Sequence, residues 1–95
     1  MIYLPTILDS NKRLCQGIYG VYDNFNDAKR CVFKNSFIDS IGRISDDFCI
    51  EMRIKNTDSF EPHKTIFNVI PEKYHGVDMT REMWDKIIDD TFVKV

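Results

Sequence analysis

The side chains that could carry acid-base or metal chemistry in this chain are few and widely spaced. His63 and His75 are its two histidines, and Cys15, Cys31 and Cys49 are its three cysteines. Structural zinc sites use paired ligands a few residues apart, and an odd number of distant cysteines makes a poor disulfide framework. We therefore expect no metal, no cofactor and no disulfide. Each cysteine is interpreted as a small buried side chain in a reducing compartment.

The two histidines flank a predicted strand over residues 65–70. At roughly 3.3 Å per residue its two ends lie some 20 Å apart, so the loops that carry His63 and His75 are not expected to meet in one pocket. The sequence also has no nucleophile elbow, no phosphate-cradling glycine loop and no HExxH motif. These observations predict a protein that is not an enzyme.

Two short segments resemble motifs of known enzyme families. Gly17-Ile18-Tyr19 is similar to the first motif of the GIY-YIG nucleases, but no second YIG strand follows it. His63-Lys64-Thr65-Ile66-Phe67 is similar to one of the two His-x-Thr motifs of the 2H phosphoesterases, whose second motif is absent because Gly76-Val77 follows His75. We interpret the first segment as a strand with a glycine kink and His63 as a loop histidine beside a strand.

Acidic side chains gather on the outer face of a predicted C-terminal helix over residues 81–91, which Thr80 can cap. A row of carboxylates can imitate the phosphates of a nucleic acid and fill the groove of a protein that binds one. Nucleic acid itself is disfavoured as the principal ligand, because the net charge is −2 and phosphate binding needs a basic surface. The acidic candidates for partner binding are Glu82, Asp85, Asp89 and Asp90.

Three tyrosines are the aromatic candidates for partner binding: Tyr3, Tyr19 and Tyr74. Two helices that cover one side of a sheet leave its other side open, and exposed apolar patches often mark interfaces. We expect this open side to carry Tyr3, Ile7, Tyr19, Val21, Ile66 and Ile70.

Hydrophobic periodicity predicts six main elements in the order ββαββα. Strands are expected over residues 1–8, 14–22, 48–55 and 65–70, and helices over residues 81–91 and from Asp23 or Asn24 to about 35–39. Pro5 favours an edge position for the first strand, whereas 65–70 is apolar enough to be central. Phe33 lies off the apolar stripe of the first helix and needs a second cover. The fold class is therefore an α+β two-layer sandwich with an antiparallel sheet of about four strands and two helices.

The composition fits one compact domain over residues 1–95, with 43% hydrophobic and 13% aromatic residues. The start of the chain has no basic leader and no long apolar run, so we expect a cytoplasmic protein without membrane contact. Ala28 is the only alanine, a bias typical of AT-rich genes such as those of phages and mobile elements.

The function expected from these features is that of a small intracellular protein-binding protein, encoded by a phage or another mobile element. It would inhibit or modulate a host defence or nucleic-acid enzyme by occupying its surface. One alternative is a self-assembling accessory module that forms a homodimer. Another is a small phosphoesterase or nucleotide-binding protein that uses His63 or His75.

Overall fold

A computed structural model describes residues 1–8, 14–45, 47–56 and 59–92, with the backbone alone at 14–18, 55–56 and 59–60. Its elements are β1 (Ile2–Leu8), β2 (Leu14–Ile18), α1 (Phe25–Asn35), β3 (Phe37–Ile38), β4 (Arg43–Ile44), β5 (Phe48–Asn56), β6 (Ser59–Ile66), the 3₁₀ turn η1 (Glu72–Tyr74) and α2 (Arg81–Thr91).

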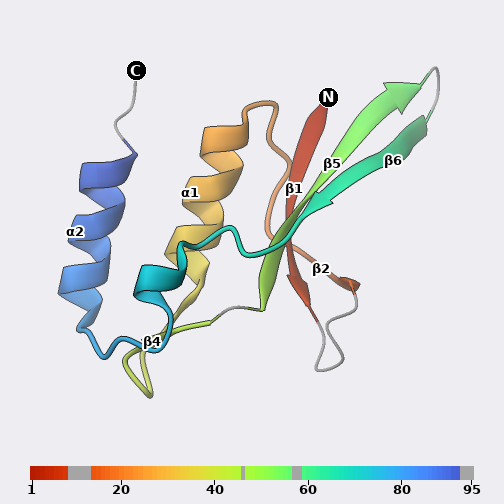
Figure 1. Cartoon of the computed structure of the whole chain (residues 1–95). Helices are drawn as coiled ribbons and strands as arrows, with labels where there is room; N and C mark the ends of the chain where they lie inside the picture. Colours follow the sequence, from red (N-terminus) through yellow and green to blue (C-terminus); the bar gives the residue numbers. More distant parts are fainter. Residues whose placement is uncertain (9–13, 46, 57–58, 93–95) are drawn as a thin grey trace.

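An antiparallel sheet in the order β2-β1-β5-β6 forms one layer, and both helices lie on the same side of it (Figure 1). The molecule is 19 Å thick along its shortest axis, which fits one layer of strands and one of helices. The predicted α+β sandwich is confirmed. The short β3-β4 hairpin and η1 were not predicted, since two-residue strands leave too little alternation to detect.

Both helices begin at the predicted caps. The side chain of Asn24 accepts hydrogen bonds from the backbone amides of Asn26 and Asp27, and Thr80 accepts one from Met83. These bonds satisfy amides that have no partner within the helix. Local sequence therefore sets where each helix starts.

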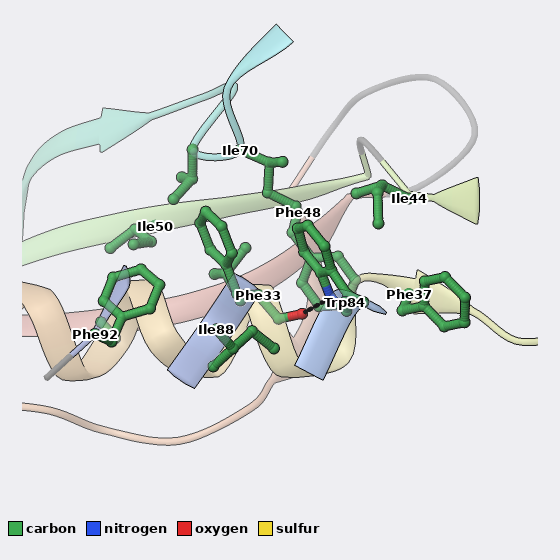
Figure 2. Close-up of a cluster of buried hydrophobic side chains, with 12 residues drawn as sticks. Phe33, Phe37, Ile44, Phe48, Ile50, Ile70, Trp84, Ile88 and Phe92 are labelled. Atoms are coloured by element: carbon green, nitrogen blue, oxygen red, sulfur yellow. Dashed lines mark hydrogen bonds between the residues drawn. The ribbon is translucent and has the colours of Figure 1, made fainter. Parts of the chain in front are cut away.

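Trp84 of α2 supplies the second cover that Phe33 needs. The two rings stack at 5.2 Å with an angle of 3° between their planes, and the indole Nε1 donates to the Phe33 carbonyl at 2.6 Å (Figure 2). This carbonyl belongs to the last turn of α1, where no backbone amide follows to bond it. It also accepts from the Ser36 hydroxyl at 3.1 Å. One buried ring thus closes the core and ties α2 to the end of α1.

The edge position predicted for β1 is wrong, because β1 lies between β2 and β5. Pro5 is tolerated there because its missing amide would point toward the β2 side, where the ladder is interrupted. The Pro5 carbonyl accepts from Tyr19, and the next bonds on that side join Tyr3 to Tyr22. Between them Gly20 adopts φ +145°, so the strand predicted over 14–22 ends early, at Ile18.

The prediction of a central strand over 65–70 is also wrong. The strand is β6, which starts at Ser59, ends at Ile66 and forms an edge of the sheet. Asn68 takes a left-handed φ of +52°, which ends the extended chain and lets Val69 and Ile70 enter the core. The polar residues of 59–64 concealed the strand, because an edge strand needs no continuous apolar face.

The sheet face predicted to be open and aromatic is the one that the helices cover. Tyr3, Ile7 and Ile66 pack against the core cluster, and Ile70 belongs to it. Tyr19 and Val21, the other two residues assigned to that face, are exposed as predicted. Tyr3 pairs with Met52 and Ile7 with Phe48, so these side chains point to the same side as the core residues of β5. The assignment failed because it placed the two predicted helices on the wrong side of β1.

The β5-β6 hairpin extends beyond the rest of the sheet (Figure 1). The register of β1 against β5 ends at the pair Ile2 and Arg53, so Ile54 to Asn56 pair with β6 alone. The radius of gyration is 13.9 Å, above the roughly 12.4 Å of a compact chain of this length. The molecule is therefore flat, with a two-stranded projection.

Candidate functional site

A groove of about 230 Å³ lies where the projecting hairpin leaves the sheet. Glu51 and Arg53 reach it from β5, on the side of the sheet opposite to the core residues Phe48 and Ile50. Its complete lining is Glu51, Met52, Arg53, Pro62, His63, Lys64 and Thr65. Every lining residue therefore comes from one of two paired strands, β5 and β6.

Glu51 and Arg53 form an ion pair along one strand. Arg53 Nη2 donates to Glu51 Oε2 at 3.0 Å, and the two side chains are only 34% and 12% exposed. Partial burial makes such a pair less sensitive to salt than a surface pair. The pair also leaves Arg53 Nε buried and without an acceptor in the part of the chain that the structure describes. Such an N–H group costs about 1–3 kcal/mol until an acceptor reaches it.

A register shift in the ladder shapes the groove. Met52 pairs with Lys64, but the next residue, Arg53, pairs with Pro62, so His63 is the extra residue of β6. Bulges of this kind bend a strand and turn side chains, and they are frequent beside binding sites. Pro62 pairs with Arg53, whereas Lys64 pairs with Met52, so the side chain of Lys64 points to the core side of the sheet and that of Pro62 to the other side.

The two histidines do not share this groove. His63 lines it, whereas His75 follows η1 and its Nε2 lies 2.9 Å from the Ile70 carbonyl. A pair of histidines acting as acid and base on a phosphate ester is therefore not assembled here. The polar residues of the lining are Glu51, Arg53, His63, Lys64 and Thr65, and the first two are already paired with each other.

The three predicted tyrosines lie apart from the groove and contact the core. The Tyr19 and Tyr74 rings make edge contacts with the core residues Phe48, at 5.2 Å, and Trp84, at 5.6 Å. The Tyr3 ring makes one at 5.7 Å with Phe25, which is partly buried and packs against the core. Tyr19 is the most accessible of them, at 43% exposure. Packing accounts for these contacts, and a role in binding is a prediction that they leave open.

The four predicted acidic residues are all exposed on α2. Asp85 lies 3.8 Å from Arg81, whose guanidinium also approaches Asp39 at 4.0 Å. Glu82, Asp89 and Asp90 have no ion-pair partner among the described residues, and we call these three the acidic ridge.

Cys31 and Cys49 are buried, as predicted, and both are free thiols in the structure. Burial and the nearby Glu51 carboxylate raise the pKa of Cys49 to about 11, so this thiol stays protonated at neutral pH. A hydrogen bond with Cys31, together with burial, raises the pKa of Tyr22. The side chain of Cys15, like Lys12 and Arg13, lies outside the described residues. Within the described ranges, no three His, Cys, Asp or Glu side chains come together to hold a metal.

Gly17 and Ile18 form the end of β2, as the strand interpretation predicted, and Tyr19 follows it directly. After Ile18 the chain turns at Gly20 and returns to β1 at Tyr22, where α1 follows. No second strand of the nuclease kind lies in that interval.

Sequence reasoning did not single out Glu51 and Arg53. Alternation along 48–55 had placed both on the side away from the core, where charged residues are ordinarily solvated. Oppositely charged residues two positions apart on one strand face were the available signal, because strand neighbours at that spacing point the same way. What the sequence could not show was the partner strand over 59–66, which turns an exposed pair into the wall of a groove.

No helix in the described part of the chain has the length and apolar content needed to cross a membrane. Comparison of the chain with protein-family models, with curated proteins and with solved structures finds no match.

Proposed function

We propose that this chain is a small protein-binding protein, encoded by a phage or another mobile element, which modulates a host defence or nucleic-acid enzyme by occupying its surface. The observation that carries the proposal is the acidic ridge on a helix held rigidly from its other side. Trp84 and Ile88 are buried in the core, while Glu82, Asp89 and Asp90 are exposed. A surface that is ordered before binding loses less conformational entropy when it binds.

The dimensions of the ridge support a partner that ordinarily binds phosphates. Glu82 and Asp89 are seven residues apart, about 10 Å along the helix axis, which is close to three phosphate steps of one nucleic-acid strand. Enzymes that act on nucleic acids neutralise such rows with lysine and arginine. Lys86 is exposed on the same outer face, four residues after Glu82 and four before Asp90, and offsets one of the three negative charges. The ridge stays net negative and therefore complements a basic groove better than it complements an acidic surface.

Asp89 and Asp90 also lie where their negative charges oppose the helix dipole. Both lie in the last turn of α2, at the negative end of its dipole, where each carboxylate costs about 0.3–1 kcal/mol at low salt. The last turn contains no basic residue to offset them. Binding of a partner would account for the presence of these two carboxylates, whereas their effect on the stability of the helix would not.

The alternative is a homodimer formed through the sheet face that was expected to be open. Tyr3, Ile7 and Ile66 of that face pack against the core cluster, and Ile70 belongs to it. A dimer formed through the sheet edge is also disfavoured, by the composition of β6. Glu61, Pro62 and Lys64 lie on this edge strand and are exposed. Proline removes a donor, and charged side chains on an edge resist pairing with a second copy. Sedimentation equilibrium is expected to show a monomer, and a tight dimer would support the alternative.

The proposal is tested by capture from bacterial lysates on the immobilised protein. The wild-type chain should retain one stoichiometric partner, and Asp89→Lys with Asp90→Lys should lose it. The matched control is Asp23→Lys with Glu72→Lys, which changes the net charge equally at exposed positions away from the ridge. Added duplex DNA should compete with the retained protein. Failure to retain a partner from several hosts, or its retention by the ridge variant, would refute the proposal.

A further inference from the structure

We infer that the tip of the β3-β4 hairpin extends the contact surface of the acidic ridge and supplies its apolar anchor, so that the partner carries an apolar pocket beside its basic groove. This inference rests on the proposed function and names a second part of the same contact. The tip, residues 38–42, lies at the same end of the molecule as the start of α2 (Figure 1). It carries two exposed isoleucines, Ile38 and Ile41.

The two isoleucines are neighbours on the tip. The Ile38 carbonyl accepts from the backbone amides of Ile41 and Gly42 at 3.2 and 2.9 Å, so the tip follows one helical turn. Residues three apart on such a turn lie side by side. Ile38 is 37% exposed and Ile41 58% exposed, although turns are ordinarily built from polar residues and glycine. Isoleucines scattered singly on a surface are normal, but adjoining ones make an apolar patch.

The hairpin is held in place before a partner arrives. Phe37 and Ile44 pair across it, and both belong to the core cluster. The Gly42 carbonyl accepts from the Met79 amide at 3.0 Å, which ties the tip to the segment that leads into α2. Because the tip and the ridge are both anchored in one core, they present a fixed surface that loses little conformational entropy on binding.

Charge connects the tip to the acidic ridge through Arg81, the first residue of α2. Its guanidinium approaches Asp39 of the hairpin at 4.0 Å and Asp85 of α2 at 3.8 Å. The same group lies 5.5 Å from the centre of the Phe37 ring. Two carboxylates beside one guanidinium leave a net charge of −1, so the one cation at the start of the helix does not interrupt the acidic surface. The patch therefore adjoins a surface that suits the same basic partner.

The two parts of the contact have different physical tasks. Charged side chains at the rim of an interface speed association and fix orientation, and salt weakens their effect. Apolar side chains stabilise the complex once they are packed in a pocket of the partner, which slows dissociation. A basic groove that only binds phosphates offers no such pocket. The tip therefore selects a particular protein among the many that have a basic groove.

The test measures association and dissociation rate constants for the partner that the wild-type chain retains, by biolayer interferometry with both proteins purified. Ile38→Thr with Ile41→Thr keeps two β-branched side chains but removes apolar surface. The dissociation rate constant should therefore rise about tenfold or more, while the association rate constant and its salt dependence stay unchanged. Asp89→Asn with Asp90→Asn should instead lower the association rate constant and its salt dependence.

The matched control is Val21→Thr with Ile54→Thr, which makes the same kind of change at two exposed positions away from α2. It should leave both rate constants unchanged. Ile41→Thr alone changes a residue of the turn, where no core contact is lost, and should raise the dissociation rate constant about threefold or more. Far-ultraviolet circular dichroism should show the wild-type fold in each variant.

The outcomes separate this inference from the function on which it rests. A dissociation rate constant that the Ile38 and Ile41 substitutions leave unchanged, or that the control raises equally, would overturn the inference and leave the ridge as the contact surface. Dependence on the isoleucines without dependence on Asp89 and Asp90 would refute the role of the ridge and leave the tip as the contact surface. Retention of no partner by the wild-type chain would refute both.

Discussion

The Phe33 carbonyl accepts hydrogen bonds from two side chains of different origin, and this arrangement predicts strong coupling between them. Trp84 Nε1 donates from α2 at 2.6 Å, and the Ser36 hydroxyl donates from the end of α1 at 3.1 Å. Both donors are fully buried, with 0% of each residue exposed. Either one alone satisfies the carbonyl, whereas removal of both leaves it buried and unpaired.

The magnitudes follow from that geometry. Trp84→Phe retains a ring to stack on Phe33 but loses a hydrogen bond worth about 1 kcal/mol and leaves a small gap that costs about 1 kcal/mol more. Ser36→Ala should cost about 1 kcal/mol by the same reasoning. In the double variant the orphaned carbonyl adds its own penalty of about 1–3 kcal/mol. The destabilisation of the double variant should therefore exceed the sum of the two single variants by about 1–3 kcal/mol.

Urea unfolding followed by far-ultraviolet circular dichroism measures this cycle, because Trp84→Phe removes the only tryptophan and with it the fluorescence signal. Met83→Ala is the control, since Met83 neighbours Trp84 on α2 but is 53% exposed. It should change the free energy of unfolding by less than about 0.5 kcal/mol. Additivity of the two core substitutions within about 0.3 kcal/mol would show that the shared carbonyl does not couple them.

Three further predictions concern a cap, a dipole and a thiol. Asn24→Ala should lower the free energy of unfolding, measured by urea titration, by about 1 kcal/mol. The Asn26 side chain makes no capping bond, so Asn26→Ala should cost less than half of that. Equal costs of the two substitutions would contradict the capping role of Asn24. Asp90→Asn should raise the free energy of unfolding, measured in urea, by about 0.3–1 kcal/mol at low ionic strength, and this gain should disappear in 1 M salt. Asp85→Asn should not raise it, because Asp85 has Arg81 as a neighbour. Burial and the Glu51 carboxylate raise the pKa of Cys49 to about 11, which lowers the fraction of thiolate at neutral pH by about 100-fold relative to an ordinary thiol. Alkylation of Cys49, mapped by mass spectrometry, should therefore be far slower in the folded protein than in urea. The same shift means that stability is complete below pH 9 and falls as pH rises from 9 toward 11, because the unfolded thiol ionises first.

The elements that the sequence predicted well are those whose signals are local. Asn24 and Thr80 each place a capping oxygen before an apolar stripe, and both helices begin there. The strict alternation of 48–55 marked β5 because one side of that strand packs in the core. Periodicity and capping depend only on neighbouring residues, so a single sequence carries them.

The elements that it predicted poorly depend on partners distant in sequence. Pro5 suggested an edge, yet the break at Gly20 interrupts the ladder beside Pro5, where the missing amide leaves no hydrogen bond unmade. Residues 59–64 looked like a loop because their pairing with β5, rather than their own hydrophobicity, makes them a strand. The groove could not be predicted for the same reason, because its lining joins residues 51–53 of β5 to residues 62–65 of β6, and the pairing of these strands was not predicted.

Substitutions on the two faces of α2 are expected to affect stability and binding in different ways. The buried face holds the helix in the fold, and the exposed face is proposed to contact the partner. Trp84 holds the helix to Phe33, so its replacement should lower the free energy of unfolding while each folded molecule still presents the acidic ridge. Asp89 and Asp90 oppose the helix dipole, so their neutralisation should stabilise the fold and weaken capture of a basic partner. If the carboxylates were only a solvated face, the same neutralisation would stabilise the protein and leave its interactions unchanged. Stability and partner capture measured together on Asp89→Asn with Asp90→Asn therefore separate these two explanations, because only a contact surface loses binding as the fold gains stability.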